Sequence, residues 1–252
     1  MLYRLELSTS QVTSRDKGIV TDLCFLVLVS LVQDKCPDDS IFYGLGSRYL
    51  QQSPSRNPSS VYVKALHAHF APKDYLYTPI IMIAAGSGFA PFRGFLQQRE
   101  VELGKSAPSI SAPAEWLLFF GCRSPKEQLY PEDISRWREK QVLTRCYNAF
   151  SREEERRVYV QDLMLERQQE LFTLLCEKGA QGIIIAIPFT GLIFFFSSAL
   201  LVFICGDAKH MARDVYDAWI RIIGTVGNMN AESAAEHVRE LEAGGRYLED
   251  VW

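Results

Sequence analysis

The feature that most constrains this chain is an alternation, from about residue 60 onward, between short apolar runs and amphipathic stretches with helical spacing. The apolar runs, which predict buried strands, are 61–66, 78–86, 116–121, 142–150 and 202–208. The amphipathic stretches, which predict helices, are 91–103, 131–140, 161–179, 207–224 and 230–245. Such alternation favours an α/β fold, a parallel sheet with helices on both faces. Ligands of such sheets bind at the carboxyl ends of the strands, where the chain reverses its order.

Composition narrows the class of protein. The chain has 252 residues, is 48% hydrophobic and carries 27 Lys and Arg against 30 Asp and Glu, a formal net charge of −3. This balance argues against a nucleic-acid binder and against intrinsic disorder. The cysteines are scattered without a C-x-x-C pair, which is typical of reduced thiols and predicts a cytoplasmic location. No metal site is expected, because His67 and His69 alone make a poor one.

The segment AAGSGFAPFRGF at 84–95 predicts a phosphate-binding turn. A buried strand delivers Gly86 and Gly88 on either side of Ser87, and a helix opens at Pro91. Glycines let backbone amides approach a phosphate, and a helix N-terminus presents unpaired N–H groups to it. An ordinary strand–helix turn has the same pattern, so the segment taken alone leaves both interpretations open.

Arginine and hydroxyl side chains gather beyond the predicted strand 142–150, in AFSREEERRVYVQ. Ser151, Arg152, Arg157 and Tyr159 would suit the 2′-phosphate of NADP, because a guanidinium binds a phosphate with two hydrogen bonds. A solvated charged loop is the alternative interpretation of this segment.

Two further segments could contact a ligand at the same edge of the sheet. ICGDA at 204–208 ends a buried strand with Cys205 and continues to a capping Asp207. GRYLEDVW places the aromatic Trp252 close to acidic residues. A buried cysteine is more often an apolar filler and a terminal segment often frays, so each segment alone also allows a purely structural role.

Together and in this order, these segments resemble the FAD/NADPH end of the diflavin reductases, a family that includes NADPH–cytochrome reductases and the reductase parts of self-sufficient monooxygenases. The resemblance runs from about Tyr43 to Trp252 and rests on TPIIMIAAGSGFAPFRGFLQQRE, LLFFGCRSP, AFSR…VYVQ, CGDAKHMARDV and GRYLEDVW. It implies a Rossmann-like NADPH-binding domain of the ferredoxin-NADP reductase type at 77–252. A truncated, β-rich remnant of the FAD-binding domain would precede it at 1–76.

The resemblance also implies roles for individual residues. Those that would bind the NADPH pyrophosphate or line its cleft are Gly86, Ser87, Gly88, Gly121, Cys122 and Arg123. Those that would hold the 2′-phosphate are Ser151, Arg152, Arg157 and Tyr159, and Gln161 would lie nearby. Cys205, Asp207 and Asp250 would act at the nicotinamide, and Trp252 would stack on the flavin. The FAD pyrophosphate would contact Gly44, Leu45, Gly46 and Ser47.

The implied activity is hydride transfer from NADPH to FAD, with electrons passing to FMN and then to a haemoprotein. The partner would be a haem-containing monooxygenase or another acceptor, reached through an FMN-binding domain supplied by a full-length relative or a separate polypeptide. The R-x-Y-S segment that holds the flavin in this family is not found in 1–40. An NADP-binding fragment without a working flavin site is therefore the alternative.

An apolar insertion at about 182–201 separates this chain from the family, whose members pass almost directly from the preceding helix to the strand with C-G-D. The stretch at 183–204 is long enough for a membrane-spanning helix on hydropathy alone. Three interpretations stay open: sequence foreign to the functional protein, such as a retained intron; an insertion that packs on the domain or associates with a membrane; and a membrane span. Membrane association would place the chain on the cytosolic face of the endoplasmic reticulum.

Overall fold

The structure, a computed structural model, describes residues 2–9, 12–13, 19–20, 23–30, 33–52, 70–105, 112–153, 157–175, 182–186, 193–197 and 200–251. The predicted strand 61–66, the two histidines His67 and His69, and Trp252 lie outside these residues. The chain divides into two compact units, residues 1–69 and residues 70–252, which we call the N-terminal and the C-terminal unit.

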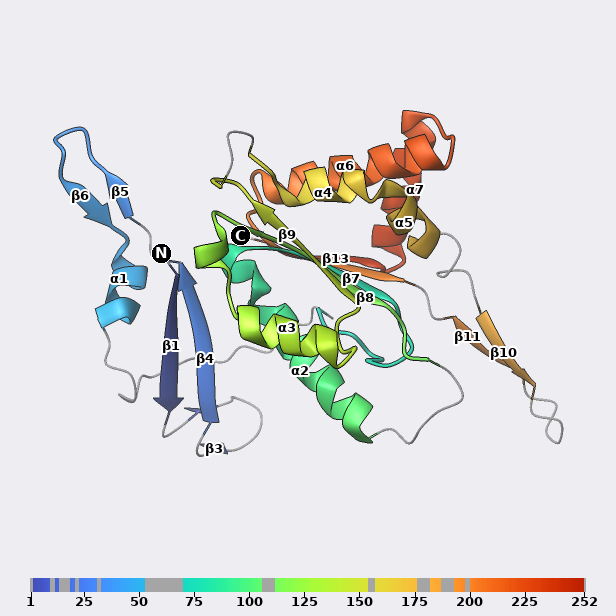
Figure 1. Ribbon diagram of the computed structural model, residues 1–252, viewed down its shortest axis with the longest axis horizontal. Helices are drawn as coiled ribbons and strands as arrows, with labels where there is room; N and C mark the ends of the chain where they lie inside the picture. The colour runs from blue at the N-terminus through green and yellow to red at the C-terminus, as the bar shows by residue number, and fades with distance from the viewer. Residues whose placement is uncertain are drawn as a thin grey trace. The chain divides into compact units, whose positions relative to one another are not determined.

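The C-terminal unit is built around a five-stranded sheet in which every neighbouring pair of strands is parallel. Its strands are β7 (Ile80–Ala85), β8 (Trp116–Cys122), β9 (Arg145–Phe150), β12 (Leu201–Gly206) and β13 (Tyr247–Val251). Their order across the sheet is β13-β12-β7-β8-β9. The sheet lies at the centre of the unit, between its helices (Figure 1). This topology confirms the predicted α/β, Rossmann-like fold.

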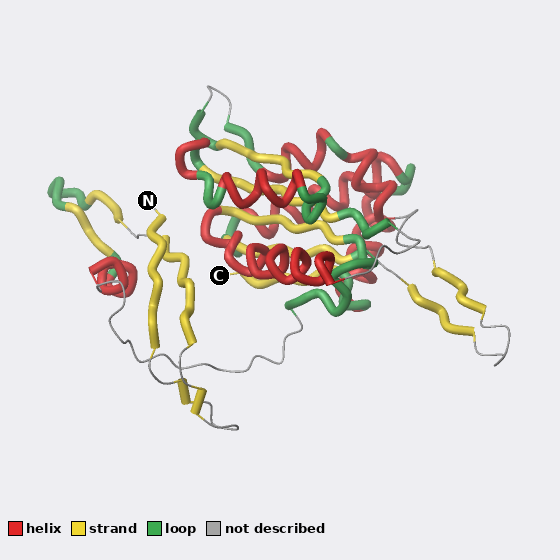
Figure 2. Tube along the Cα trace, turned by 60° about the horizontal axis from the view of Figure 1, so that its bottom comes forward, coloured by secondary structure: helices red, strands yellow, loops and turns green. Residues whose placement is uncertain are grey.

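Helices cover both faces of this sheet (Figures 1 and 2). One face carries η1 (Gly86–Phe89), α2 (Ala90–Lys105) and α3 (Pro131–Glu139), which bury aromatic side chains such as Phe92 and Trp137. The other face carries α4 (Val160–Glu166), α5 (Gln168–Thr173), α6 (Met211–Val226) and α7 (Ala231–Ala243), and its core includes Trp219. A short turn, η2 (Pro125–Glu127), follows β8.

The central strands are apolar on both sides because both of their faces are covered. Along β7, Ile81 and Ile83 face the core under α4–α7, while Ile80 and Met82 face the core under α2 and α3. All four side chains are completely buried. A continuous apolar run without alternation therefore forms a strand here, as the sequence predicted.

The N-terminal unit consists of short antiparallel pairs and one helix. β1 (Leu2–Thr9) pairs with β4 (Leu23–Ser30), β2 (Val12–Thr13) with β3 (Ile19–Val20), and β5 (Gln33–Lys35) with β6 (Ile41–Tyr43). The helix α1 (Leu45–Gln52) follows. These pairs make the unit rich in strands, and the assignment of this unit as an FAD-binding remnant stays a prediction.

The apolar insertion forms strands where it is described. β10 (Gly182–Ala186) and β11 (Ile193–Ser197) pair as an antiparallel hairpin, and β12 begins at Leu201. The described residues of 183–204 are in strands, apart from Leu200. Among the residues that the structure describes, no helix is long and apolar enough to cross a membrane.

Candidate functional site

The site is expected at the carboxyl edge of the sheet between β7 and β12. From β7 the chain continues through β8 and β9 on one side, whereas β12 and β13 extend the sheet on the other. In open α/β sheets this reversal of strand order leaves a crevice for ligands outside the carboxyl ends. Gly86 and Ser87 follow β7 there, and Asp207 follows β12.

Glycines allow the backbone segments at this corner to approach each other. A Cβ on Gly88 would lie 2.0 Å from the carbonyl oxygen of Cys205, so no other residue fits without moving η1 or β12. Gly86 has a φ of +54°, in the left-handed region that favours glycine. A Cβ on Gly121 would lie 3.1 Å from Val160 Cγ1. The predicted residues Gly86, Ser87 and Gly88 thus form a tight backbone turn directly before α2.

Backbone hydrogen bonds join the loops that follow β8 and β9. The Ser151 N–H donates to the Cys122 carbonyl at 3.0 Å, and the Arg152 N–H donates to the Arg123 carbonyl at 2.8 Å. The Val158 N–H donates to the Phe150 carbonyl at 3.4 Å, which returns the chain to the end of β9 just after Arg157. Residues far apart in the sequence therefore meet at one corner of the sheet.

Three arginines follow the ends of β8 and β9 at this corner. Arg123, Arg152 and Arg157 are all exposed. Within the described part of the chain, none of them takes part in an ion pair or a side-chain hydrogen bond. Exposed guanidinium groups on neighbouring loops are suited to bind an anion with charge-assisted hydrogen bonds.

The start of α4 adds two predicted residues to this corner. Tyr159 precedes the helix with 42% of its side chain exposed, and its N–H donates to the Asp162 carboxylate at 2.9 Å. Gln161 donates from Nε2 to Oδ2 of Asp214, in the first turn of α6, at 3.0 Å. Asp214 is a residue that the sequence analysis missed, because only the fold brings α6 beside α4.

Cys205 and Asp250 are neighbours in the sheet. The register pairs Cys205 with Asp250 on one side and with Ala84 on the other. Burial, and secondarily the charge of Asp250, raises the pKa of the Cys205 thiol to about 12. The thiol is therefore protonated at neutral pH and lies buried beneath the turn at Gly88.

Asp207 is held by the turn that leads into α6. Its carboxylate accepts the N–H groups of Lys209 at 3.2 Å and His210 at 3.1 Å, and it lies 3.0 Å from His210 Nδ1. Burial raises the pKa of Asp207, but these hydrogen bonds outweigh it and leave the pKa below its ordinary value. The sequence predicted that Asp207 caps α6 directly, whereas the helix begins later, at Met211.

The predicted flavin residues belong to the N-terminal unit. Gly44 precedes α1 and accepts the Arg48 N–H at its carbonyl, at 2.9 Å. Leu45, Gly46 and Ser47 form the first turn of the helix, and the Leu45 side chain is 92% exposed. Their role at the FAD pyrophosphate stays a prediction.

Comparison with known proteins identifies the family. The family described as oxidoreductase NAD-binding domain matches residues 82–217, more than half of the chain. The chain belongs to this family. The matched residues of the oxidoreductase NAD-binding domain include the turn at Gly86–Gly88, the arginine corner and Asp207.

The individual relatives belong to a narrower group of proteins than the domain family does. The NADPH–cytochrome P450 reductase of Sus scrofa is 37% identical over 178 residues, which are 69% of this chain and 22% of that protein. The reductase of Drosophila melanogaster is 31% identical over 257 residues, which cover 100% of this chain and 34% of that protein. The chain thus spans about a fifth to a third of the relatives it matches. The predicted resemblance to the C-terminal FAD/NADPH part of the diflavin reductases is confirmed.

Proposed function

We propose that the carboxyl edge of the sheet binds NADPH and that the chain works as the nucleotide-binding part of an NADPH–haemoprotein reductase. The observation that carries this proposal is a corner of exposed arginines, Arg123, Arg152 and Arg157, beside a glycine turn in an oxidoreductase NAD-binding domain. When bound, NADPH supplies a hydride and FAD accepts it.

Different residues at the corner would bind different parts of the nucleotide. The backbone amides of Gly86–Gly88 and the start of α2 would hold the pyrophosphate, because a glycine turn directly before a helix presents N–H groups to an anion. Arg152 and Arg157, with Ser151 and Tyr159, would bind the 2′-phosphate. Gly121, Cys122, Arg123 and Gln161 would line the cleft between these two groups.

At the nicotinamide end, the chain contributes a thiol and two carboxyl groups. Cys205 presents a protonated thiol, so it adds no charge beside the nicotinamide. Asp250, its neighbour in the sheet, would orient the nicotinamide, and Asp207 would fix the turn that borders it. Trp252 would cover the flavin until the nicotinamide enters.

A titration with NADP⁺ and NAD⁺ tests the 2′-phosphate assignment. We expect Arg157→Ala to weaken NADP⁺ binding by about 10- to 100-fold, the usual range for a hydrogen bond to a charged group, and to leave NAD⁺ binding nearly unchanged. Calorimetry on the whole chain measures both. Arg221→Ala, an exposed arginine farther along α6, is the matched control and should change neither. Equal losses for the two nucleotides would refute the assignment.

We further propose that FAD binds at Gly44–Ser47 and passes electrons to FMN and then to a haem-containing monooxygenase. The names of the relatives, NADPH–cytochrome P450 reductases, support the last of these partners. The absorption spectrum of the purified chain tests the flavin step: bound FAD supports a reductase, and NADP⁺ binding without flavin supports the fragment that only binds nucleotide.

We place this activity in the cytoplasm, since the described cysteines Cys36, Cys122, Cys146 and Cys205 are free thiols.

A further inference from the structure

The hairpin of β10 and β11 is a sheet of its own. β10 pairs with β11 and, among the described strands, neither pairs with any other. Within this part of the chain both strands are therefore edges, and an edge strand presents backbone N–H and C=O groups to any strand that can pair with it. A two-stranded hairpin is marginally stable in water, whereas three or more strands are stable. A further strand beside the hairpin would therefore stabilise it.

The five-stranded sheet carries charged residues on both of its edges, and the hairpin does not. β9 has Arg145, and β13 has Glu249 and Asp250. Charged residues, prolines and bulges on edge strands prevent pairing with another chain. The strands β10 and β11 contain neither charge nor proline, and their one-to-one register contains no bulge. The hairpin is thus open to the addition of a strand.

Of the two strands, β11 has the residues that best suit pairing with a copy of itself. The segment 192–198, LIFFFSS, has high β-propensity and contains no charge, Pro or Gly. Identical segments of this composition pair with one another edge to edge. In contrast, β10 begins at Gly182, and Pro188 follows it closely. The edge of β11 is therefore the favoured one.

We propose that β11 pairs antiparallel with β11 of a second copy of this chain. A two-fold axis at Phe195 would place this residue opposite itself, and Phe194 of each copy opposite Phe196 of the other. Aromatic cross-strand pairs stabilise antiparallel strands. The product is a four-stranded sheet in the order β10-β11-β11-β10, with the closed symmetry that is commonest among dimers.

A second copy fits the hairpin better than a lipid bilayer does. A bilayer offers no hydrogen bonds to the edge of an open sheet, and unsatisfied N–H and C=O groups are costly in hydrocarbon. A second β11 satisfies these groups along the whole strand. The inference does not depend on the proposed function, because the hairpin precedes the amino end of β12 and the candidate site lies beyond its carboxyl end.

Sedimentation velocity of the whole chain between about 1 µM and 100 µM tests the dimer, since this interval brackets a micromolar dissociation constant. We expect the monomer mass at the lower concentration and twice that mass at the higher one. Phe195→Lys should weaken the association by about 10-fold or more, because it places like charges opposite each other. Val101→Lys is the matched control: Val101 is an exposed apolar residue on α2, and the same added charge there should change nothing. A chain that stays monomeric at every concentration would overturn the inference.

A mixture of two variants separates the interface from a damaged hairpin. Neither Phe195→Lys nor Phe195→Glu should dimerise alone, whereas an equimolar mixture should regain the dimer, because opposite charges then lie across the new strand pair. A misfolded hairpin would not be rescued in this way, so a mixture that stays monomeric would contradict the pairing at Phe195. Flotation with phosphatidylcholine vesicles provides the last comparison: a chain that floats with the vesicles and stays monomeric without them would show a lipid-binding hairpin instead.

Discussion

At the scale of single residues, the candidate site depends on how closely backbone segments approach. Gly88 lies against the carbonyl of Cys205, and this contact joins the turn after β7 to the end of β12. The sequence predicted a glycine turn at 84–95 from its pattern alone. It could not predict the partner of Gly88, because the contact exists only once β12 has taken its place beside β7.

Replacing Gly88 tests this contact. Gly88→Ala should destabilise the C-terminal unit by about 1–3 kcal/mol, since its Cβ meets backbone atoms that cannot rotate away. Gly94→Ala is the matched control: Gly94 lies within α2 with nothing within 4 Å of the added Cβ, so it should stabilise the helix by up to about 1 kcal/mol. Urea unfolding of both variants measures the difference. Equal urea midpoints for the two variants would mean that η1 moves away from the added Cβ without a loss of stability, and would contradict the prediction.

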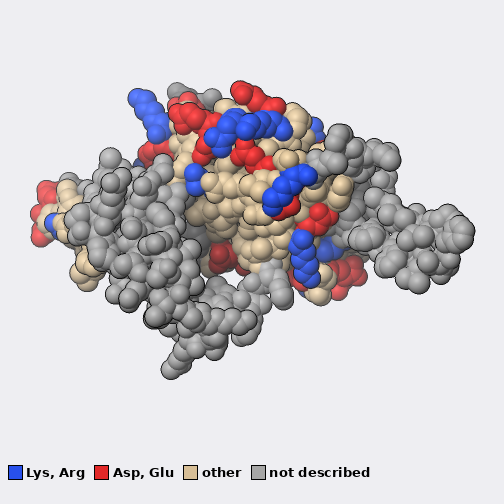
Figure 3. All heavy atoms as spheres, turned by 90° about the horizontal axis from the view of Figure 1, so that it is seen from below, with Lys and Arg blue, Asp and Glu red and all other residues tan. Residues whose placement is uncertain are grey.

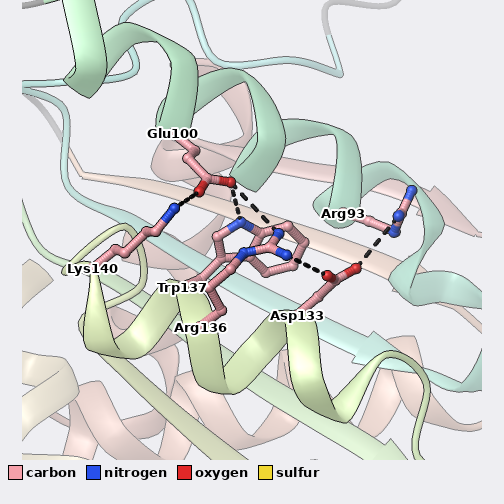
Figure 4. A network of polar contacts seen from close by, with 6 residues as sticks. All are labelled: Arg93, Glu100, Asp133, Arg136, Trp137 and Lys140. Carbon is pink, nitrogen blue, oxygen red and sulfur yellow. Dashed lines mark hydrogen bonds and ion pairs between the residues drawn. The ribbon is translucent and has the colours of Figure 1, made fainter.

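At the scale of elements, α2 and α3 are joined by a network of polar contacts around Glu100 (Figure 4). The Glu100 carboxylate accepts the Trp137 indole N–H at 2.9 Å and the Lys140 ammonium at 2.7 Å. Asp133 adds ion pairs to Arg93 at 3.4 Å and Arg136 at 3.0 Å. Figure 3 shows positive and negative side chains interleaved on the surface seen from this side, as a network of such pairs requires.

The network makes the stability of this helix pair depend on pH. Hydrogen bonds from Lys140 and Trp137 lower the pKa of Glu100 below its ordinary value. Its contribution is therefore present above the unfolded pKa and is lost as the pH falls through the lower, folded value. We expect Glu100→Gln to cost about 1 kcal/mol at pH 7 and less in acid. Thermal unfolding at both pH values measures this, with the exposed Glu139→Gln as control; an identical cost in acid would contradict it.

Element boundaries show what a sequence pattern does not contain. The amphipathic stretch 161–179 predicted one helix, but α4 ends at Glu166 and α5 begins at Gln168. Between them Arg167 leaves helical geometry, with φ −105° and ψ 21°, and lies over the Tyr147 ring at 5.3 Å. The apolar spacing continues through the break because both helices cover the same core. The helical periodicity therefore predicted which face of 161–179 is buried, but it did not predict the break at Arg167.

At the scale of the whole molecule, the insertion and the candidate site lie at opposite ends of the strand β12. The hairpin β10–β11 precedes Leu201, which pairs with Ile80 at the start of β7, whereas the site lies beyond Cys205. The sequence showed where the insertion occurs along the chain. The sequence could not show at which end of the strands the insertion lies, because this depends on the direction of β12 in the sheet. The short strands of the N-terminal unit were missed for a related reason: pairs of two or three residues have no period to detect.

Deleting the hairpin tests this separation. A chain without residues 182–197 should bind NADP⁺ within about two-fold of the full chain, because charge–phosphate contacts and glycine turns at the carboxyl edge are left in place. Calorimetry provides the comparison. A complete loss of binding in a folded sample would mean that the hairpin supports the sheet, and would contradict the separation.

The buried, protonated Cys205 has a consequence for chemical durability. Oxidants and alkylating agents attack the thiolate form of cysteine, and access to the sulfur limits their rate. With a pKa raised to about 12 and almost no exposed surface, Cys205 offers neither the reactive form nor a path to it. In this fold, burial therefore protects the Cys205 sulfur from oxidation and alkylation.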